Sequence, residues 1–213
     1  MIEVVPAILA KTKEELESAI KKIESHAERV HLDVLDGAFT GANKSIHYYE
    51  ELEAIEIKLK LDIHLMVTYP QEIVPQWLMN PNADRFWIHV ESQGNLADLC
   101  LEIRGQGRKV GMVINPETLS GTVLEYLPMI DYIQFMTVHP GSYGRPFLTD
   151  MLDKISTFHE SHPDLIIAVD GGINPETVHM VHGAGAEIAV SGSYIMNSPD
   201  PAKALTELKD GFQ

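Results

Sequence analysis

The chain has 213 residues, which is enough for one large α/β domain with a substantial core. Its 16 lysine and arginine residues against 31 aspartate and glutamate residues give a formal net charge of −15, and no basic block occurs, which argues against nucleic acid as a partner. Cys100 is the single cysteine, and the sequence shows neither a secretion signal nor an apolar run of membrane-spanning length, so we expect a cytoplasmic protein with no membrane partner.

Short runs rich in β-branched residues alternate with segments of helical period along the whole chain. The runs predict strands at Glu3–Leu9, Arg29–Val34, Lys60–Met66, Arg85–His89, Lys109–Ile114, Tyr132–Met136, Leu165–Asp170 and Ile188–Val190. The intervening segments predict helices at Lys13–Glu24, Tyr48–Ala54, Ile73–Leu78, Leu96–Ile103, Val123–Leu127, Met151–His159, Thr177–His182 and Ala202–Phe212. This alternation predicts an α/β fold, a (β/α)8 TIM barrel forming a single domain over residues 1–213, with an open doubly wound sheet as the alternative.

The pentapeptide Ile-Asn-Pro-Glu-Thr occurs twice, at residues 114–118 and 173–177, each time after a predicted strand. Asparagine is a good helix cap, and proline is favoured at the first helical position. We therefore expect a helix to begin after both strands.

Polar side chains gather where the predicted strands end. In an extended strand His31 and Asp33 share one face, and His64 and Asp170 stand near the ends of two other strands. These ends meet at one mouth of a barrel, so the two imidazoles and two carboxylates could bind a divalent metal such as zinc, iron, cobalt or manganese. The alternative for His64 is an ordinary core histidine.

Three other polar or reactive residues have simpler interpretations. Asp62 shares a face with His64, so it either orients that ring or lies in water at the strand end. Asp36 is expected to stabilise a loop, and Cys100 to pack in the core from a helix.

Glycine-bearing loops follow the sixth, seventh and eighth predicted strands. They contain His139–Phe147, Gly171-Gly172 and Ser191-Gly192-Ser193. Barrels of this type often bind phosphate with the backbone of their last loops, although each loop taken alone could be a plain turn.

The order and spacing of these motifs resemble the ribulose-phosphate 3-epimerase family over nearly the whole chain. The matching segments are Val5–Leu9, His31–Gly37, Asp62–Val67, Ile88–Glu91, Asn115–Thr118, Met136–Gly141, Val169–Gly172 and Ser191–Ser193. The resemblance implies a barrel of the ribulose-phosphate-binding type, in which His31, Asp33, His64 and Asp170 bind one divalent metal. It also implies that Asp33 and Asp170 are the two acid/base groups of an isomerase.

Such an enzyme inverts a carbon next to a carbonyl through an enediolate, converting D-ribulose 5-phosphate to D-xylulose 5-phosphate. The resemblance further implies that substrate contacts come from Met66, Met136, Gly141, Gly144, Gly171, Gly172, Gly192 and Ser193, and that the protein is a homo-oligomer. Ordinary core packing is the alternative for the two methionines and for Leu35, which stands where a third methionine is usual.

The sequence departs from the family pattern around the expected site. Ala7 replaces a serine, Ala38 replaces a histidine, and the lid loop reads Ser142-Tyr143-Gly144-Arg145. Arg145 could bind a phosphate or an acid group, or it could point into solvent. A hexulose phosphate such as allulose 6-phosphate is therefore an alternative substrate, and a non-catalytic sugar-phosphate- or metal-binding relative is the alternative of another class.

Overall fold

The computed structural model describes residues 2–41, 44–46, 52, 55–141 and 144–210. Within these ranges, eight parallel strands pair in chain order and close into a barrel. The strands are β1 (Glu3–Ile8), β2 (Arg29–Leu35), β3 (Lys60–Met66), β4 (Ala83–His89), β5 (Lys109–Ile114), β6 (Tyr132–Met136), β7 (Ile166–Asp170) and β8 (Ile188–Ser191). Because β1 pairs with β8, the (β/α)8 barrel is confirmed and the open sheet is excluded.

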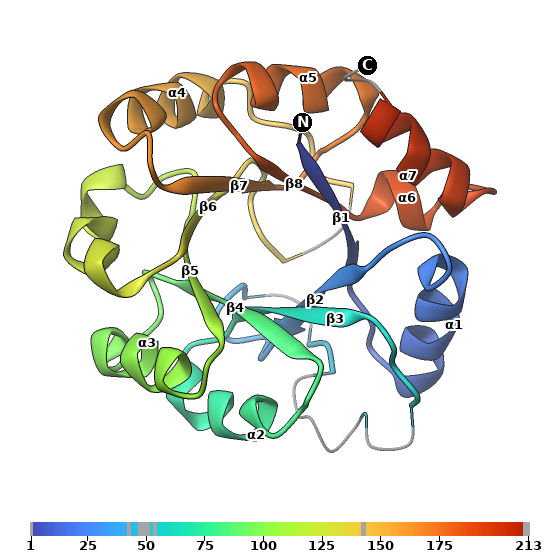
Figure 1. Ribbon diagram of the computed structural model, residues 1–213, viewed down its shortest axis with the longest axis horizontal. Helices are drawn as coiled ribbons and strands as arrows, with labels where there is room; N and C mark the ends of the chain where they lie inside the picture. Colours follow the sequence, from blue (N-terminus) through green and yellow to red (C-terminus); the bar gives the residue numbers. More distant parts are fainter. Residues whose placement is uncertain (1, 42–43, 47–51, 53–54, 142–143, 211–213) are drawn as a thin grey trace.

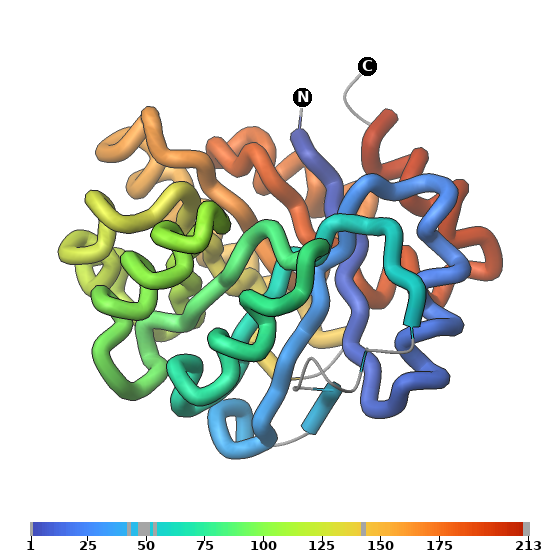
Figure 2. The backbone as a smooth tube through the Cα atoms, turned by 60° about the horizontal axis from the view of Figure 1, so that its bottom comes forward, coloured from blue at the N-terminus to red at the C-terminus, as the bar shows by residue number. Residues whose placement is uncertain are grey.

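Helices surround the strands, and α7 lies beside β1 where the ring closes (Figures 1 and 2). The α-helices are α1 (Lys13–Ile23), α2 (Val74–Leu78), α3 (Leu96–Gly105), α4 (Met151–Ser161), α5 (Pro175–Gly183), α6 (Ser193–Met196) and α7 (Pro201–Asp210). Two 3-10 segments are η2 (Pro70–Glu72) and η3 (Ser120–Met129). Of the helices in the described residues, none is long and apolar enough to cross a membrane.

Local sequence explains why these helices form and which face they bury. The Thr12 side chain accepts a hydrogen bond from the Glu15 backbone N–H and caps α1, whose Leu16, Ile20 and Ile23 face the barrel. Cys100 is buried on α3 with its sulfur 3.9 Å from that of Met112, as expected for core packing.

Some of the expected helices differ from the observed ones. The segment expected over Val123–Leu127 belongs to the 3-10 segment η3, which contains Pro128 and so cannot keep regular α-helical hydrogen bonds. The sequence does not predict the short α6, because four residues are too few to show a helical period of hydrophobic residues. Of the helix expected over Tyr48–Ala54, only Leu52 lies within the described residues, and Phe212 also lies outside them.

The two Ile-Asn-Pro-Glu-Thr segments behave differently. Asn174 caps α5 as expected, accepting hydrogen bonds from the Glu176 and Thr177 backbone N–H groups. The helix start expected at Asn115 is wrong, because residues 115–118 form a turn. Lys154 on α4 donates to the carbonyls of Asn115, Pro116 and Thr118, so these acceptors are satisfied without a helix.

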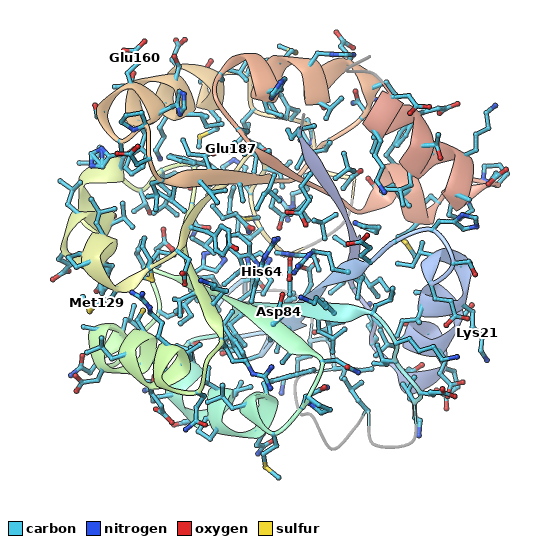
Figure 3. The ribbon with its side chains drawn as sticks, in the orientation of Figure 1. Lys21, His64, Asp84, Met129, Glu160 and Glu187 are labelled. Atoms are coloured by element: carbon cyan, nitrogen blue, oxygen red, sulfur yellow. The ribbon has the colours of Figure 1, made fainter. Side chains whose placement is uncertain are left out.

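The inward-facing residues of neighbouring strands form layers along the barrel. The register pairs His31 with Asp62 and Asp33 with His64, so polar side chains from β2 and β3 meet inside the barrel. Figure 3 shows His64 within the ring of strands, whereas Lys21 lies on an outer helix.

Asp62 does not orient His64, and it does not lie in water. It is buried in the layer below, where its oxygens lie 2.6 Å from Arg29 Nη1 and 3.4 Å from Arg85 Nη1. A buried carboxylate needs such partners, and the two guanidinium groups supply them. Asp62 therefore belongs to an ion-pair network at the closed end of the barrel.

Asp36 fixes the loop that follows β2, as the sequence suggests. One carboxylate oxygen accepts 2.8 Å hydrogen bonds from the backbone N–H groups of Ala38 and Phe39, and the other accepts one of 2.7 Å from Thr68. Partial burial acts against ionisation, but these hydrogen bonds hold the pKa of Asp36 below its ordinary value. The carboxylate ties the end of β2 to the loop after β3.

We expect Asp36→Ala to lower the free energy of unfolding at pH 7 by about 1–3 kcal/mol, because it leaves backbone donors without their acceptor. The pKa of Asp36 is depressed in the folded state, so its contribution is fully present above the ordinary value of 3.8 and is lost as the pH falls below that value and through the lower pKa of the folded state. Denaturant unfolding at several pH values should show the difference from wild type shrinking in acid. Asp164→Ala, at an exposed carboxylate, is the control, and a pH-independent difference would contradict the assignment.

Candidate functional site

Four side chains from three strands meet at the end of the barrel where the strands finish. His31 and Asp33 come from β2, His64 from β3 and Asp170 from β7, and their donor atoms all lie within 4.8 Å of one another. His64 Nδ1 is 3.1 Å from an Asp33 oxygen and 3.3 Å from an Asp170 oxygen. His31 Nε2 is 3.6 Å from the same Asp170 oxygen and 3.9 Å from Asp33.

Burial makes the charges of this cluster interdependent. Although burial disfavours the imidazolium, the two carboxylates raise the pKa of His64 to about 9. Burial and the negative charge of Asp170 raise the pKa of Asp33. Burial also acts against ionisation of Asp170, but His31 and His64 hold its pKa well below the usual range. The two carboxyl groups therefore differ in their tendency to carry a proton.

The donor set fits a divalent cation. Both ring nitrogens of His31 are buried and lack a hydrogen-bond partner among the described residues, which is costly for a polar group. A cation among the four side chains would give Nε2 a partner and would offset the two buried carboxylates. The interpretation of His64 as a plain core histidine accounts for its burial but not for its position beside two carboxylates.

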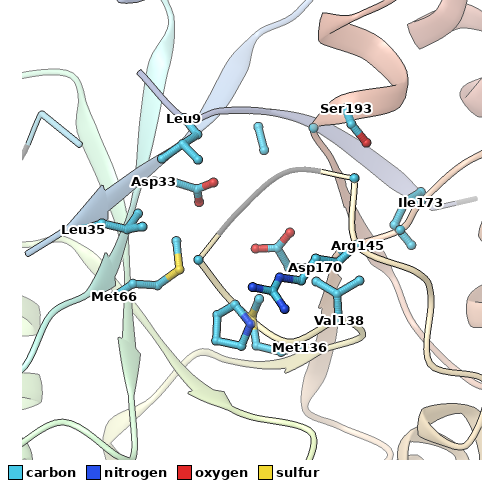
Figure 4. A pocket seen from close by; sticks show the side chains of 17 residues that line it. Leu9, Asp33, Leu35, Met66, Met136, Val138, Arg145, Asp170, Ile173 and Ser193 are labelled. Carbon is cyan, nitrogen blue, oxygen red and sulfur yellow. The ribbon is translucent and has the colours of Figure 1, made fainter. Parts of the chain in front are cut away.

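A pocket opens above this cluster at the mouth of the barrel. Figure 4 shows the carboxylates of Asp33 and Asp170 pointing into it, with Met66 and Met136 beside them. The substrate contacts implied by the resemblance all line this pocket, namely Met66, Met136, Gly141, Gly144, Gly171, Gly172, Gly192 and Ser193. His31 and His64 lie beneath it and are fully buried.

The glycines at one edge of the pocket are required by their backbone geometry. Gly171 has a φ of 116°, and a Cβ there would lie 2.3 Å from Val138 Cγ2. Gly172 has a φ of 67°, and its Cβ would lie 2.9 Å from that of Phe147. A larger residue would be strained and would displace the neighbouring loop.

Several departures from the family pattern line the same pocket, but the exposed Ala38 is not among its lining residues. Ala7 and Leu35 line it, so neither position supplies a polar or sulfur contact. Arg145 is exposed but also lines the pocket, and Figure 4 shows its guanidinium group on the side of Asp170 and Met136. Ser142 and Tyr143 lie outside the described residues.

Two residues beside the site received no role from the sequence. His89 is fully buried at the end of β4, with Nε2 2.9 Å from His64 Nε2 and Nδ1 3.2 Å from Glu91 Oε2. Burial lowers the pKa of His89 to about 4. The sequence does carry a pattern that points to these two residues: His89 and Glu91 are spaced i, i+2 at a strand end, as His31 and Asp33 are.

Comparison with known proteins identifies the family of the chain. Residues 3–196 match the ribulose-phosphate 3 epimerase family. The ribulose-phosphate 3-epimerase of Bacillus subtilis is 34% identical over 215 residues, covering 98% of this chain and 99% of the relative. That of Eremothecium gossypii is 31% identical over 222 residues, covering 99% and 92%.

The fold also resembles that of other sugar-phosphate barrels. The crystal structure of 3-hexulose-6-phosphate synthase from Salmonella typhimurium superposes with a TM-score of 0.73 at 17% identity, covering 99% of this chain and 98% of that one. At this identity the likeness extends to the fold alone. The family match and the near-complete coverage of the curated relatives go further: the chain belongs to the ribulose-phosphate 3-epimerase family.

Proposed function

We propose that the protein is a metal-dependent 3-epimerase that interconverts D-ribulose 5-phosphate and D-xylulose 5-phosphate. The observation that carries this proposal is the pair of carboxylates, Asp33 and Asp170, which enter one pocket from two non-adjacent strands, β2 and β7, and share His64 between them. The names of the relatives in Bacillus subtilis and Eremothecium gossypii support the same activity.

Epimerisation next to a carbonyl needs two proton carriers. One group removes the proton from one face of the carbon, and the other returns a proton to the opposite face. The raised pKa of Asp33 favours its acid form, and the lowered pKa of Asp170 favours its carboxylate. In this state Asp170 accepts the C3 proton and Asp33 donates one, and the reverse reaction exchanges the roles.

The metal ligands in this proposal are His31, Asp33, His64 and Asp170, a set compatible with zinc, iron, cobalt or manganese. A bound divalent ion supplies positive charge to the oxygen anion that develops beside the reacting carbon. Met66 and Met136 line the same part of the pocket, where they exclude water from the reacting carbon.

The rest of the pocket suits the phosphate end of the substrate. Gly171, Gly172, Gly192 and Ser193 bring backbone groups to one side of it, and Gly141, Gly144 and Arg145 contribute from the loop after β6. In a chain with a net charge of −15, a guanidinium group at the mouth offers an anion a local cation. We therefore assign the phosphate to this side and the reacting carbon to the carboxylates.

Metal-loaded protein in D2O should incorporate deuterium at C3 of ribulose 5-phosphate and form xylulose 5-phosphate. Asp33→Asn and Asp170→Asn should each slow turnover by about 10²–10⁴-fold, because each removes one proton carrier. Asp84→Asn, at the opposite end of the barrel, is the matched control and should retain exchange. Exchange with allulose 6-phosphate alone would identify the six-carbon substrate, and no exchange with either sugar would refute the epimerase.

Metal content should depend on His64 and on pH. We expect His64→Ala to lose most of its metal in elemental analysis after dialysis, because it removes one of the donor atoms. In the metal-free protein His64 keeps its proton until the pH approaches about 9, so the metal and the proton compete. The apparent Co²⁺ affinity should therefore rise from pH 6.5 to 8.5 by at least about tenfold per pH unit. A pH-independent affinity, or unchanged metal in His64→Ala, would remove His64 from the site.

Arg145→Gln should raise the KM for the phosphorylated ketose about five- to tenfold and leave kcat nearly unchanged. The reason is that an exposed charge–phosphate contact contributes about 1 kcal/mol to binding and does not touch the reacting carbon. Initial-rate kinetics at two salt concentrations would measure the effect, which should diminish at high salt. Arg108→Gln, whose guanidinium group binds backbone carbonyls away from the pocket, is the matched control. An unchanged KM would mean that Arg145 does not bind the substrate.

A further inference from the structure

Beside the cluster lies a continuous chain of hydrogen bonds, buried at His64 and His89 and partly exposed at Glu91, that the proposed reaction does not itself use. It runs from His64 through His89 to Glu91, with distances of 2.9 Å and 3.2 Å, and the two rings lie within 13° of parallel. Both rings have no exposed surface, so their nitrogens must find partners inside the protein. We call these three residues the relay.

Glu91 determines which atom donates and which accepts in each hydrogen bond of the relay. Its Oε1 accepts a 2.9 Å hydrogen bond from the Asn115 backbone N–H and a second from the Thr118 hydroxyl. Although burial opposes ionisation, these donors and His89 lower the pKa of Glu91, so it is an acceptor. Oε2 must then accept the proton of His89 Nδ1.

The proton positions follow along the chain. With its proton on Nδ1, neutral His89 presents a lone pair at Nε2, and His64 Nε2 must donate to it. His64 therefore keeps its Nε2 proton, and the proton that it gives up when a metal binds is that of Nδ1, the nitrogen that lies 3.1 Å and 3.3 Å from the two carboxylates. This is the arrangement that a metal at the cluster requires.

The other histidine of the cluster is held differently. His31 Nδ1 has no hydrogen-bond partner within the described part of the chain, and the ring packs against those of His64 and Trp87. Ring packing and the nearby carboxylates of the cluster set its orientation. His64 is in addition oriented from its far side by Glu91 acting through the imidazole of His89.

The far end of the relay is fixed to the barrel wall. The turn that supplies Asn115 and Thr118 has its carbonyls bound by the Lys154 ammonium group from α4. The position of Glu91 is therefore determined by β4, the turn after β5 and α4 together. This same network is what prevents Asn115 from starting a helix.

We infer that His89 and Glu91 are positioning residues that hold His64 with Nε2 protonated and Nδ1 free, and so raise the affinity of the cluster for a divalent metal. A carboxylate acting through an imidazole orients the ring that binds the metal and increases its basicity. The inference rests on the metal site of the proposed function, but not on which sugar the enzyme converts.

The test measures Co²⁺ dissociation constants of chelator-stripped protein at one pH. His89→Phe keeps a ring of similar size but removes the acceptor, and should weaken binding about 10- to 100-fold. His89→Gln, whose amide oxygen can accept from His64 Nε2, should recover part of the loss. Glu91→Gln should also weaken binding, because an amide N–H facing His89 favours the opposite tautomer. Phe39→Leu changes a ring whose centroid lies 4.8 Å from that of His89 but removes no hydrogen bond of the relay, and should bind as wild type does.

A spectroscopic measurement keeps the test valid if a variant folds poorly. In Zn²⁺-loaded wild-type protein with ¹⁵N-labelled histidine, His64 should show a protonated Nε2 and a metal-bound Nδ1, and His89 a protonated Nδ1. The opposite tautomer of His64, or a folded His89→Phe protein that binds Co²⁺ like wild type, would overturn the relay and leave the epimerase intact. Absence of metal binding by the wild-type protein would contradict the metal site and the relay with it.

Discussion

Asp33 and His64 are aligned across neighbouring strands by the parallel register of β2 and β3, and the rest of the mouth is arranged around that pair. Side chains alternate between the two faces of a strand, so a slip of one residue would turn His31, Asp33 and His64 towards the outer helices. The apolar neighbours Leu32, Val34, Ile63 and Leu65, all buried, pack outward and hold the register. The hydrophobic core thus positions the polar site.

The barrel has to accommodate buried charge at both ends, and it does so in two ways. At the closed end, Asp62 is neutralised by Arg29 and Arg85 from the protein itself. At the mouth, Asp33 and Asp170 lie against imidazoles and the Gln134 amide rather than guanidinium groups, and His31 keeps nitrogens without hydrogen-bond partners among the described residues. At the closed end the buried negative charge is balanced by arginine side chains, whereas the carboxylates at the mouth remain able to bind a cation and to move protons.

The site can stay rigid while the loop after β6 varies, because different parts of the barrel hold the two. The relay from His64 to Glu91 is anchored to β4, to the turn after β5 and through Lys154 to α4, none of which belongs to the loop after β6. Arg145 and the glycines of that loop line the pocket, whereas the relay lies beneath it. Changes in the loop can therefore alter the binding of the sugar phosphate without displacing the residues proposed for proton transfer.

The sequence by itself determined the order of the strands and placed His31, Asp33, His64 and Asp170 near strand ends, because hydrophobic period and strand-end position are local properties of the chain. The choice of a closed barrel over an open sheet was decided by the pairing of β1 with β8. The sequence could not determine the partners of those residues. Asp62 has the same spacing from His64 as His31 has from Asp33, yet it binds Arg29 and Arg85. Asn115 carries the same helix-start signal as Asn174, yet Glu91 and Lys154 hold it in a turn. The role of His89 likewise emerged only when β3 and β4 were brought side by side, since a side chain's environment depends on contacts between segments far apart in the sequence.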